Sequence, residues 1–436
     1  MSRGATRTLG TLSLAVAVAV VLAGALPALA GPAKTRLVSQ TSAGEPADGE
    51  SGSPSVSASG RYVAFESRAA NLQGGGPNPS AYVRDRKTGK TRLVSRTPAG
   101  EPAGAGLSGL GGSISAAGRY VVFHSTDPGF PGDHTGFIFN VYRRDMKTGK
   151  IKLVSRSSAG DPADGDSQFP TISASGRFVA FHSRATNLAS LGGIGIVHVY
   201  IHDVKTGRTR LASRTSAGEP ADGTQSVGAL ISPSGRYVGF ESNADNLGGD
   251  DSYTDVFVHD RKTRRTRLIS QNSAGEPATG NDSYGGWISA SGRYVGFESG
   301  AVNLPGDHTN VQFNSYVRDL KTGKTKLVSK TSGGAPTTGG QSATAVLSAS
   351  GRYVAFRSEA TNLPGDNTVW NSYVRDLKTG KTKLVSKTSG GAVATGGDSL
   401  SPVIAASGAF VAFHSEATNL PGDDAVQDVY VHGPLR

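Results

Sequence analysis

The stretch RDRKTGKTRLVS at residues 84–95 contains Gly89-Lys90-Thr91, a tripeptide that also ends phosphate-binding loops. Such a loop needs another glycine five residues before the Gly-Lys pair, because small residues let backbone N–H groups wrap the phosphates, but position 84 is arginine. Variants of the stretch recur at 143–155, 202–213, 259–270, 318–329 and 375–386, and KTRLVS stands alone at 34–39. A nucleotide site is needed once, so the stretch indicates a structural repeat in which Gly-Lys-Thr is a turn.

The repeat has three landmarks, and each occurs seven times at spacings of 56 to 60 residues. The glycine of the A-S-G-R-Y-V-A-F pattern falls at 60, 118, 176, 235, 292, 351 and 408, and the leucine of the L-V-S pattern at 37, 93, 153, 211, 268, 327 and 384. The third landmark, Y-V-x-D, ends at 85, 145, 203, 260, 319 and 376, and its seventh copy, VYVH, precedes Gly433. Seven copies of one structural unit are therefore predicted.

Each copy contains four short runs rich in Val, Ile, Tyr and Phe, which in the first copy lie at 53–59, 61–67, 81–85 and 91–95. No run has a helical period, so the chain is predicted to be all-β. Four-stranded units that cannot bury both faces alone favour a seven-bladed β-propeller of antiparallel blades, a single domain over 31–436. The copies begin with a fourth strand (34–39) and end with a third (428–432). The N-terminal strand is therefore expected to complete the last blade and close the ring.

The order S-x-S-G-R-Y-V-A-F, A-x-N-L-P-G-D, Y-V-x-D-x-K-T-G-K resembles the TolB-like, or WD-repeat-like, propeller repeats of exported bacterial proteins over residues 34–432. The resemblance implies a propeller fold and is much less specific for function. The family's namesake combines six blades with a separate α/β domain and works in the periplasm with a peptidoglycan-associated lipoprotein. Seven repeats and no such domain are found here.

Residues 1–30 have the layout of a secretory signal peptide, with Arg3 and Arg7, an apolar run, and the small-residue site Ala28-Leu29-Ala30. Cleavage after Ala30 is expected, with an uncleaved anchor helix as the alternative, since the run is near the ~20 residues that span a bilayer. No later segment is apolar enough to span. The chain has no cysteine, hence no disulfide or lipid-attachment site. An exported monomer is predicted, in the periplasm, at the cell wall or outside the cell.

The first candidate site lies where the first strand of each copy begins. The position carries Glu50, Ser108, Asp166, Gln225, Asp282, Gln341 and Asp398. If the first strands line the central channel, these side chains ring one mouth, with Tyr284 and Trp287 nearby. Three interpretations stay open: acids that cap the preceding loop, a mouth for a cation or other ligand, or a catalytic pair, which glycoside hydrolysis would need at roughly 5–9.5 Å. Core packing is the alternative for Tyr284 and Trp287.

Two loops between second and third strands break the symmetry with apolar residues that look exposed, and they predict a partner-binding patch. They contain Phe130, Phe137, Ile138 and Phe139 in copy 2, and Leu188, Leu191, Ile194 and Ile196 in copy 3. His124, His182 and His414 share one second-strand position, where solvated strand ends are expected rather than a metal site. The tips GDDSYTD (249–255) and GDDAVQD (422–428) lack the regular spacing of calcium loops, so no cofactor is expected, with calcium as the weaker alternative.

Charge is the strongest asymmetry. The formal net charge is +11, and the six hairpins between third and fourth strands contain 26 Lys or Arg against 6 Asp. Six turns between first and second strands, which share that face, each add an arginine. The predicted basic face includes Lys87, Lys90, Lys147, Lys150, Lys205, Lys321, Lys324, Lys378 and Lys381. Solvated turns are the alternative explanation, and nucleic acid is not the expected partner.

Together these features predict an exported, non-catalytic binding or scaffold propeller that recognises a protein or an anionic cell-envelope polymer. The alternative is a carbohydrate-active hydrolase or lyase that uses the acids at the channel mouth.

Overall fold

The computed structural model describes residues 33–76, 78–103, 108–132, 137–189, 196–250, 252–306, 312–365, 368–422 and 426–435. The predicted signal peptide at 1–30 lies outside these residues, as do Leu191 and Ile194 of the predicted patch. Among the described residues, no helix is long and apolar enough to cross a membrane.

Twenty-eight strands form seven four-stranded sheets, one for each copy of the repeat. Blades 1 and 2 contain β2 (Ser51–Val56), β3 (Tyr62–Ser67), β4 (Ser80–Asp85) and β5 (Lys90–Leu93), then β6 (Ser108–Ile114), β7 (Tyr120–Ser125), β8 (Asn140–Asp145) and β9 (Ile151–Leu153). Blades 3 and 4 contain β10 (Ser167–Ile172), β11 (Phe178–Ser183), β12 (His198–Asp203) and β13 (Arg208–Leu211), then β14 (Ser226–Ile231), β15 (Tyr237–Ser242), β16 (Asp255–Asp260) and β17 (Arg265–Leu268).

Blades 5 and 6 contain β18 (Ser283–Ile288), β19 (Tyr294–Ser299), β20 (Asn314–Asp319) and β21 (Lys324–Leu327), then β22 (Ser342–Leu347), β23 (Tyr353–Ser358), β24 (Asn371–Asp376) and β25 (Thr382–Leu384). Blade 7 contains β26 (Ser399–Ile404), β27 (Val411–Ser415), β28 (Asp428–Gly433) and β1 (Lys34–Leu37). A short 3-10 helix, η2 (Asp245–Leu247), lies in blade 4.

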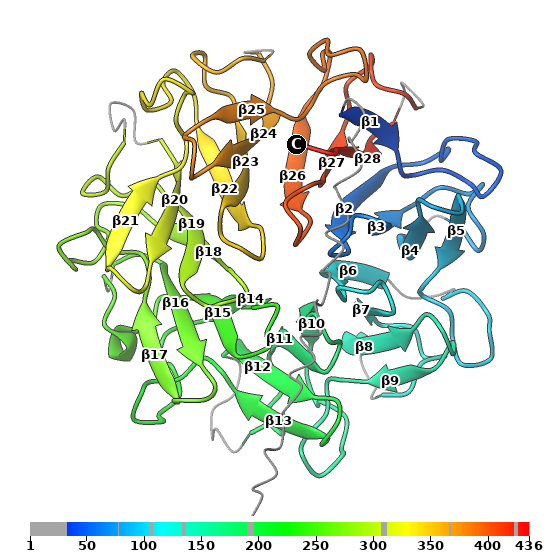
Figure 1. Ribbon diagram of the computed structural model, residues 1–436. Coiled ribbons are helices and arrows are strands. Elements are labelled where there is room, and N and C mark those ends of the chain that lie inside the picture. Colours follow the sequence, from blue (N-terminus) through cyan, green and yellow to red (C-terminus); the bar gives the residue numbers. More distant parts are fainter. Residues whose placement is uncertain are drawn as a thin grey trace, which may run out of the picture. The chain divides into compact units, whose positions relative to one another are not determined.

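The strands of each blade pair antiparallel in order, and successive first strands contact one another around the centre, with β26 also contacting β2. In Figure 1 the first strands lie innermost and the fourth strands outermost. The ring closes through β1, which pairs with β28 from Lys34 opposite Gly433 to Leu37 opposite Tyr430. The prediction of a seven-bladed propeller closed by its N-terminal strand is confirmed.

The closing strand makes the same contacts as the fourth strands of other blades. The Ser39 hydroxyl donates to Asp428 Oδ1 (2.5 Å) and accepts the Val429 N–H (2.9 Å). Within blade 5, the Ser329 hydroxyl donates in the same way to the Asn314 side chain (2.9 Å). The hydrogen bond that joins the end of a fourth strand to a third strand is therefore also present at the ring closure.

Apolar cores lie between adjacent blades, where each turn glycine meets an aromatic side chain of the preceding blade. Gly118 has a φ of 73°, and a Cβ added there would lie 2.1 Å from the ring of Tyr62. Only glycine fits at such a position, because it tolerates positive φ and leaves room for the ring. The same contact joins Gly60 to Phe410, Gly176 to Tyr120, Gly235 to Phe178, Gly292 to Tyr237, Gly351 to Tyr294 and Gly408 to Tyr353.

Candidate binding surfaces

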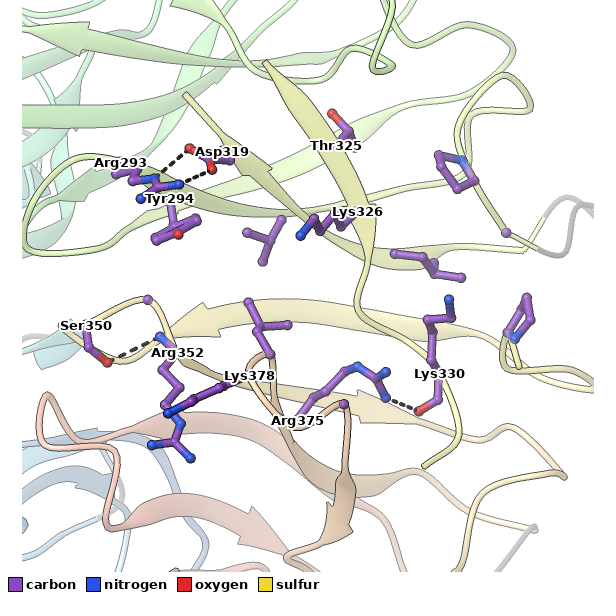
Figure 2. A pocket seen from close by; sticks show the side chains of 18 residues that line it. Arg293, Tyr294, Asp319, Thr325, Lys326, Lys330, Ser350, Arg352, Arg375 and Lys378 are labelled. Carbon is purple, nitrogen blue, oxygen red and sulfur yellow. Dashed lines mark hydrogen bonds and ion pairs between the residues drawn. The ribbon is translucent and has the colours of Figure 1, made fainter. Parts of the chain in front are cut away.

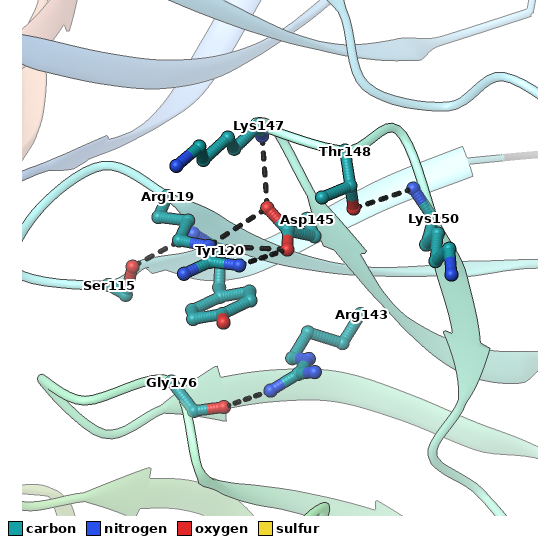
Figure 3. Close-up of polar contacts among 9 residues, drawn as sticks. All are labelled: Ser115, Arg119, Tyr120, Arg143, Asp145, Lys147, Thr148, Lys150 and Gly176. Carbon is teal, nitrogen blue, oxygen red and sulfur yellow. Dashed lines mark hydrogen bonds and ion pairs between the residues drawn. The ribbon is translucent and has the colours of Figure 1, made fainter.

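Each turn arginine of the predicted basic face pairs with the aspartate that ends the third strand of its own blade. In blade 2, Arg119 Nη2 lies 2.7 Å from Asp145 Oδ2, and Asp145 Oδ1 accepts the Lys147 N–H (2.9 Å; Figure 3). The hydrogen bond from Arg119 lowers the pKa of Asp145 to about 2. The equivalent pairs are Arg61–Asp85, Arg177–Asp203, Arg236–Asp260, Arg293–Asp319 and Arg352–Asp376. These six arginines therefore fix hairpins and are not free to attract anions.

Other arginines hold neighbouring blades together. Arg143 in β8 lies 4.2 Å from the centre of the Tyr120 ring and donates to the carbonyl of Gly176 in blade 3 (2.6 Å; Figure 3). Arg375 in β24 is buried and donates through Nη1 to the carbonyls of Lys330 and Thr331 (3.0 and 3.1 Å). These guanidinium groups are likewise committed to structure, so the exposed cations are a smaller set than the sequence count suggests.

Two groups of exposed cations concern the predicted basic face, and they share Lys90, Lys150, Lys324 and Lys381. The nine predicted lysines of the basic face are all exposed. A second row lies along the outermost strands, where a pattern of two cations around one threonine, or around Ile151 in blade 2, turns both cations outward. Thr91, for example, is buried and donates to the Gln40 carbonyl of the preceding blade (2.6 Å). The row, called here the basic rim, consists of Lys34, Arg36, Lys90, Arg92, Lys150, Lys152, Arg208, Arg210, Arg265, Arg267, Lys324, Lys326, Lys381 and Lys383.

All fourteen side chains of the basic rim are exposed, and each blade contributes two. The seven outermost strands contain no acidic residue, and no ion pair within the described residues involves a member of the rim. The sequence analysis missed Lys34 and Arg36 because it counted only hairpins. The signal in the sequence was the alternation of cations with threonine. Successive side chains of a strand point to opposite faces, so the two cations around a buried threonine share the exposed face.

At the channel mouth, three of the predicted acids accept hydrogen bonds from the preceding blade. Asp166, Asp282 and Asp398 accept the N–H groups of Phe139, Thr254 and Trp370 at 2.9, 2.8 and 2.9 Å. Each of these N–H groups lies just before or at the start of a third strand. Glu50 is exposed, and its carboxylate lies 4.0 Å from Arg68 Nε.

The two aromatic residues predicted near the mouth differ in environment. The Tyr284 hydroxyl donates to Asp282 Oδ2 (2.9 Å), and its ring stacks on Phe313 at 5.9 Å between centroids. The pKa of Tyr284 is raised to about 12, mainly by burial and secondly by the hydrogen bond to Asp282. Trp287 packs against the apolar core between blades 5 and 6. Tyr284 is therefore joined to a mouth acid, whereas Trp287 is not.

The expectation of solvated histidines is wrong. The side chain of His124 is only 8% exposed, and burial lowers the pKa of His124, His182 and His414 to about 4. At the same position in blade 4, Glu241 accepts the N–H of Gly285 from blade 5 (2.7 Å). Both faces of a second strand are covered by neighbouring blades, so a polar residue there lies between two sheets instead of in water.

The predicted apolar patch is only partly exposed. Phe130 is 3% exposed and packs edge-on against Phe123, so its assignment to the surface is wrong: the loop folds back onto the core of blade 2. Phe137 is 82% exposed, while Phe139 and Ile196 are half-buried. Phe139 contacts His124, with ring centroids 5.3 Å apart.

One exposed aromatic residue was missed. Phe169 is 53% exposed, and its ring lies 5.4 Å from that of His124 and 5.2 Å from that of His182. The other blades whose side chains are described have Ser53, Gly228, Gly285, Thr344 and Ser401 at this position. A single aromatic residue among small ones was the signal available in the sequence. The patch therefore comprises Phe137, Phe139 and Phe169, because Phe139 and Phe169 both contact His124 and Phe137 lies two residues before Phe139.

Several cavities are lined by charged residues, and two of them concern the predicted sites. A groove of about 740 Å³ runs between blades 5 and 6, with Lys326 of β21 on one wall and Lys378 of the β24–β25 turn on the other (Figure 2). A smaller cavity of about 230 Å³ at the mouth, between blades 7 and 1, is lined by residues that include Glu50, Glu66 and His414.

The solved structures most useful for comparison are propellers. The β-propeller domain of the Trilobed protease from Pyrococcus furiosus matches 88% of this chain and 94% of its own, at a TM-score of 0.53 and 11% identity. Oligogalacturonate lyase from Vibrio parahaemolyticus matches 92% of this chain and 97% of its own, at a TM-score of 0.51 and 12% identity. TolB from Acinetobacter baumannii matches 87% of this chain and 82% of its own, at a TM-score of 0.40 and 14% identity. The likeness is one of fold.

The predicted propeller fold is thus shared with a solved β-propeller domain, that of the Trilobed protease. No protein-family model and no curated protein sequence matches the chain. The similar structures include an oligogalacturonate lyase and the β-propeller domain of a protease, and a shared fold does not decide between catalysis and binding.

Proposed function

We propose that this protein is an exported, non-catalytic binding propeller that holds an anionic cell-envelope polymer against its basic rim and hairpin lysines. The observation that carries the proposal is the basic rim: each blade contributes two exposed cations on or directly before its outermost strand, and those seven strands contain no acid. A linear polyanion that follows this surface meets lysines and arginines from consecutive blades at fixed spacing. Release of its counterions then supplies most of the binding free energy.

Charged side chains on an edge strand also have a second role, because they prevent edge-to-edge pairing of sheets. The two roles differ in what they require. Protection of an edge needs repulsion between copies of the protein, whereas polymer binding needs attraction to a ligand and a steep dependence on salt. The experiment below separates them.

The non-catalytic part of the proposal rests on how the candidate catalytic groups are used. Asp166, Asp282 and Asp398 accept backbone N–H groups, and the shared histidine position is buried between blades. Among the described residues, no group of three or more His, Cys, Asp or Glu side chains is arranged to hold a metal ion. These arrangements favour structural roles for the acids over general acid–base chemistry.

The test uses the protein without residues 1–30 and measures the Kd for poly(glycerol phosphate), polygalacturonate and neutral dextran between 50 and 200 mM salt. Affinity for both polyanions is expected to fall at least about a hundredfold over this range, with no binding to dextran. Charge reversal of Lys87, Lys90, Lys321, Lys324, Lys378 and Lys381 is expected to abolish binding. Neutralising the exposed Glu45, Glu101 and Glu219 is the control and is expected to preserve it. Equal binding of dextran, or binding that ignores salt, would overturn the proposal.

Export has its own test. The protein recovered from the envelope or culture medium of the native cell is expected to begin at Gly31, as determined by N-terminal sequencing. Recovery from the cytosol with residues 1–30 intact would contradict this part of the proposal.

A second candidate function, contact with a protein partner, is favoured by the apolar patch. Phe137 and Phe169 are 82% and 53% exposed, which leaves two aromatic rings open to a partner. A photo-crosslinker at position 137 is expected to capture one partner protein in the intact envelope, and Phe169→Ser is expected to reduce that capture without lowering the Tm. Undiminished capture by the variant would argue against the patch.

A further inference from the structure

We infer that the groove between blades 5 and 6 is a specific seat for a short acidic segment of the polymer, in particular a sugar ring that carries a carboxylate. The inference rests on the proposed function, since it assigns one place on the basic surface where the polymer is held by shape as well as by charge. The remainder of the basic rim then attracts the chain without fixing its register.

The floor of the groove is apolar. It is formed by Tyr294, Val317 and Leu327 from blade 5 and by Leu377 from blade 6. Tyr294 and Leu377 pack against the same core between these blades and are half-buried, so one face of each lies toward the groove. Such a floor suits the carbon-rich face of a ring.

The walls are cationic. Lys326 projects from β21, Lys330 lies where the chain leaves for blade 6, and Lys378 lies in the β24–β25 turn (Figure 2). No ion pair among the described residues involves any of the three lysines. Among the described residues of the lining, Asp319 is the one acid, and it is paired with Arg293 at 2.6 Å. The groove therefore has unbalanced positive charge above an apolar floor.

Its size agrees with a ligand of several rings. The volume of about 740 Å³ lies within the roughly 300–1,000 Å³ that small-molecule sites occupy. A lysine ammonium group acts as a point charge, so it binds a carboxylate or a phosphate without requiring a fixed geometry. The apolar floor is what distinguishes a ring from a flexible glycerol phosphate chain.

The chain itself suggests how to fill the groove without disturbing the fold. Leu377 follows the third-strand aspartate of its blade, and its N–H donates to the Arg352 carbonyl. Arginine occupies this position in blades 1 and 4, where Arg86 and Arg261 lie 4.7 and 3.9 Å from the ring centres of Phe410 and Phe178. A guanidinium group is thus tolerated over the preceding blade's aromatic ring, as Leu377→Arg would place it over Tyr294.

The experiment compares Leu377→Arg with Leu320→Arg, which adds the same charge at the equivalent position one blade earlier. There Leu320 and Tyr237 pack against the same core. The probe is a fluorescent hexamer of galacturonate at 100 mM salt, with hexamers of glycerol phosphate and of neutral glucose as comparisons. The unmodified protein is expected to bind one galacturonate hexamer more tightly than either comparison. Leu377→Arg is expected to weaken that binding at least about tenfold although it adds a cation, while Leu320→Arg leaves it unchanged or slightly tighter.

A second matched pair tests the walls. Charge reversal of Lys326 and Lys378 is expected to weaken hexamer binding far more than reversal of Arg92 and Lys147, which hold the same positions between blades 1 and 2. The Tm of every variant is measured to establish that it is folded.

The outcomes separate this inference from the proposed function. If both members of each pair act alike, or if the two acidic hexamers bind equally, the groove is not a seat, while salt-dependent binding of long polyanions still supports the basic rim. If long polyanions bind and the galacturonate hexamer does not, the inference is likewise overturned. If no polyanion binds, both fail.

Discussion

Replacing Val38 with alanine is expected to destabilise the whole propeller, although Val38 lies only a few residues from the predicted N-terminus of the exported protein. Its side chain is completely buried against blade 7, and its N–H donates to the Val429 carbonyl at 2.7 Å. In blade 1, Val94 is buried to the same extent and donates to the Ala81 carbonyl at 2.7 Å. The two valines have the same position in their blades, so Val94→Ala is a matched control.

The expected loss follows from the two methyl groups removed. At about 0.8 kcal/mol for each buried carbon, the transfer contribution is about 1.6 kcal/mol. The cavity left in a core that relaxes only partly raises the total to about 2–3 kcal/mol. For about 400 residues the entropy of unfolding is near 0.8 kcal/mol/K, which converts this loss into a Tm decrease of about 3 °C.

The assay is thermal and urea unfolding of the protein that begins at Gly31, followed by circular dichroism. Val38→Ala and Val94→Ala are expected to lower the Tm by similar amounts. A protein that begins at Ser42 lacks β1, and it is expected to aggregate as its concentration rises because the exposed edge of β28 pairs with other copies. If Val38→Ala leaves the Tm unchanged while Val94→Ala lowers it, β1 does not close the ring and the reasoning is refuted.

Three further predictions concern the contacts between and within blades. Gly118→Ala is expected to lower the Tm more than Gly149→Ala. Both glycines have φ near 73°, but the new Cβ would lie 2.1 Å from the Tyr62 ring at position 118 and 3.8 Å from the flexible Arg144 side chain at position 149. Equal decreases in Tm would contradict the close contact. The pKa of Asp145 is about 2 in the folded protein and 3.8 ordinarily, so its pairing with Arg119 stabilises the fold above pH 3.8. This stabilisation is lost as the pH falls towards 2. Asp145→Asn is expected to flatten that part of the curve of unfolding free energy against pH, measured by urea unfolding. Burial raises the pKa of Glu241 from 4.5 to about 7, so stability is expected to fall as the pH rises from 4.5 to 7, and Glu241→Gln is expected to remove this slope; an unchanged slope in the variant would assign it to another group.

Much of the fold was predictable because it is encoded locally and repeated. The turn glycines, the alternation along each strand and the lone KTRLVS at 34–39 each specify a short-range property, and seven copies of a unit that cannot bury its own faces leave a closed ring as the solution. The exposure of the predicted lysines was predictable for the same reason, because a tight turn between two strands keeps its side chains in water.

The tertiary structure alone decided which polar and aromatic residues are free. The period of a strand says that His124 and Phe123 face opposite sides, but a blade is covered on both sides, so His124 is buried between sheets and not solvated. Phe130 and Phe137 lie in one loop with similar neighbours in sequence, yet they are 3% and 82% exposed, because the loop's path over Phe123 determines which ring is covered.

Composition likewise did not reveal which cations are paired. In six blades the sequence determined that an arginine precedes the second strand and an aspartate ends the third strand. These residues are 24 to 26 apart and become neighbours only when the two strands pair. The groove between blades 5 and 6 arises from side chains that lie on two sheets, and its charge depends on which lysines those sheets leave unpaired. Repetition along the chain therefore determined the architecture, whereas the accessible chemistry was decided by contacts between blades, which no single repeat contains.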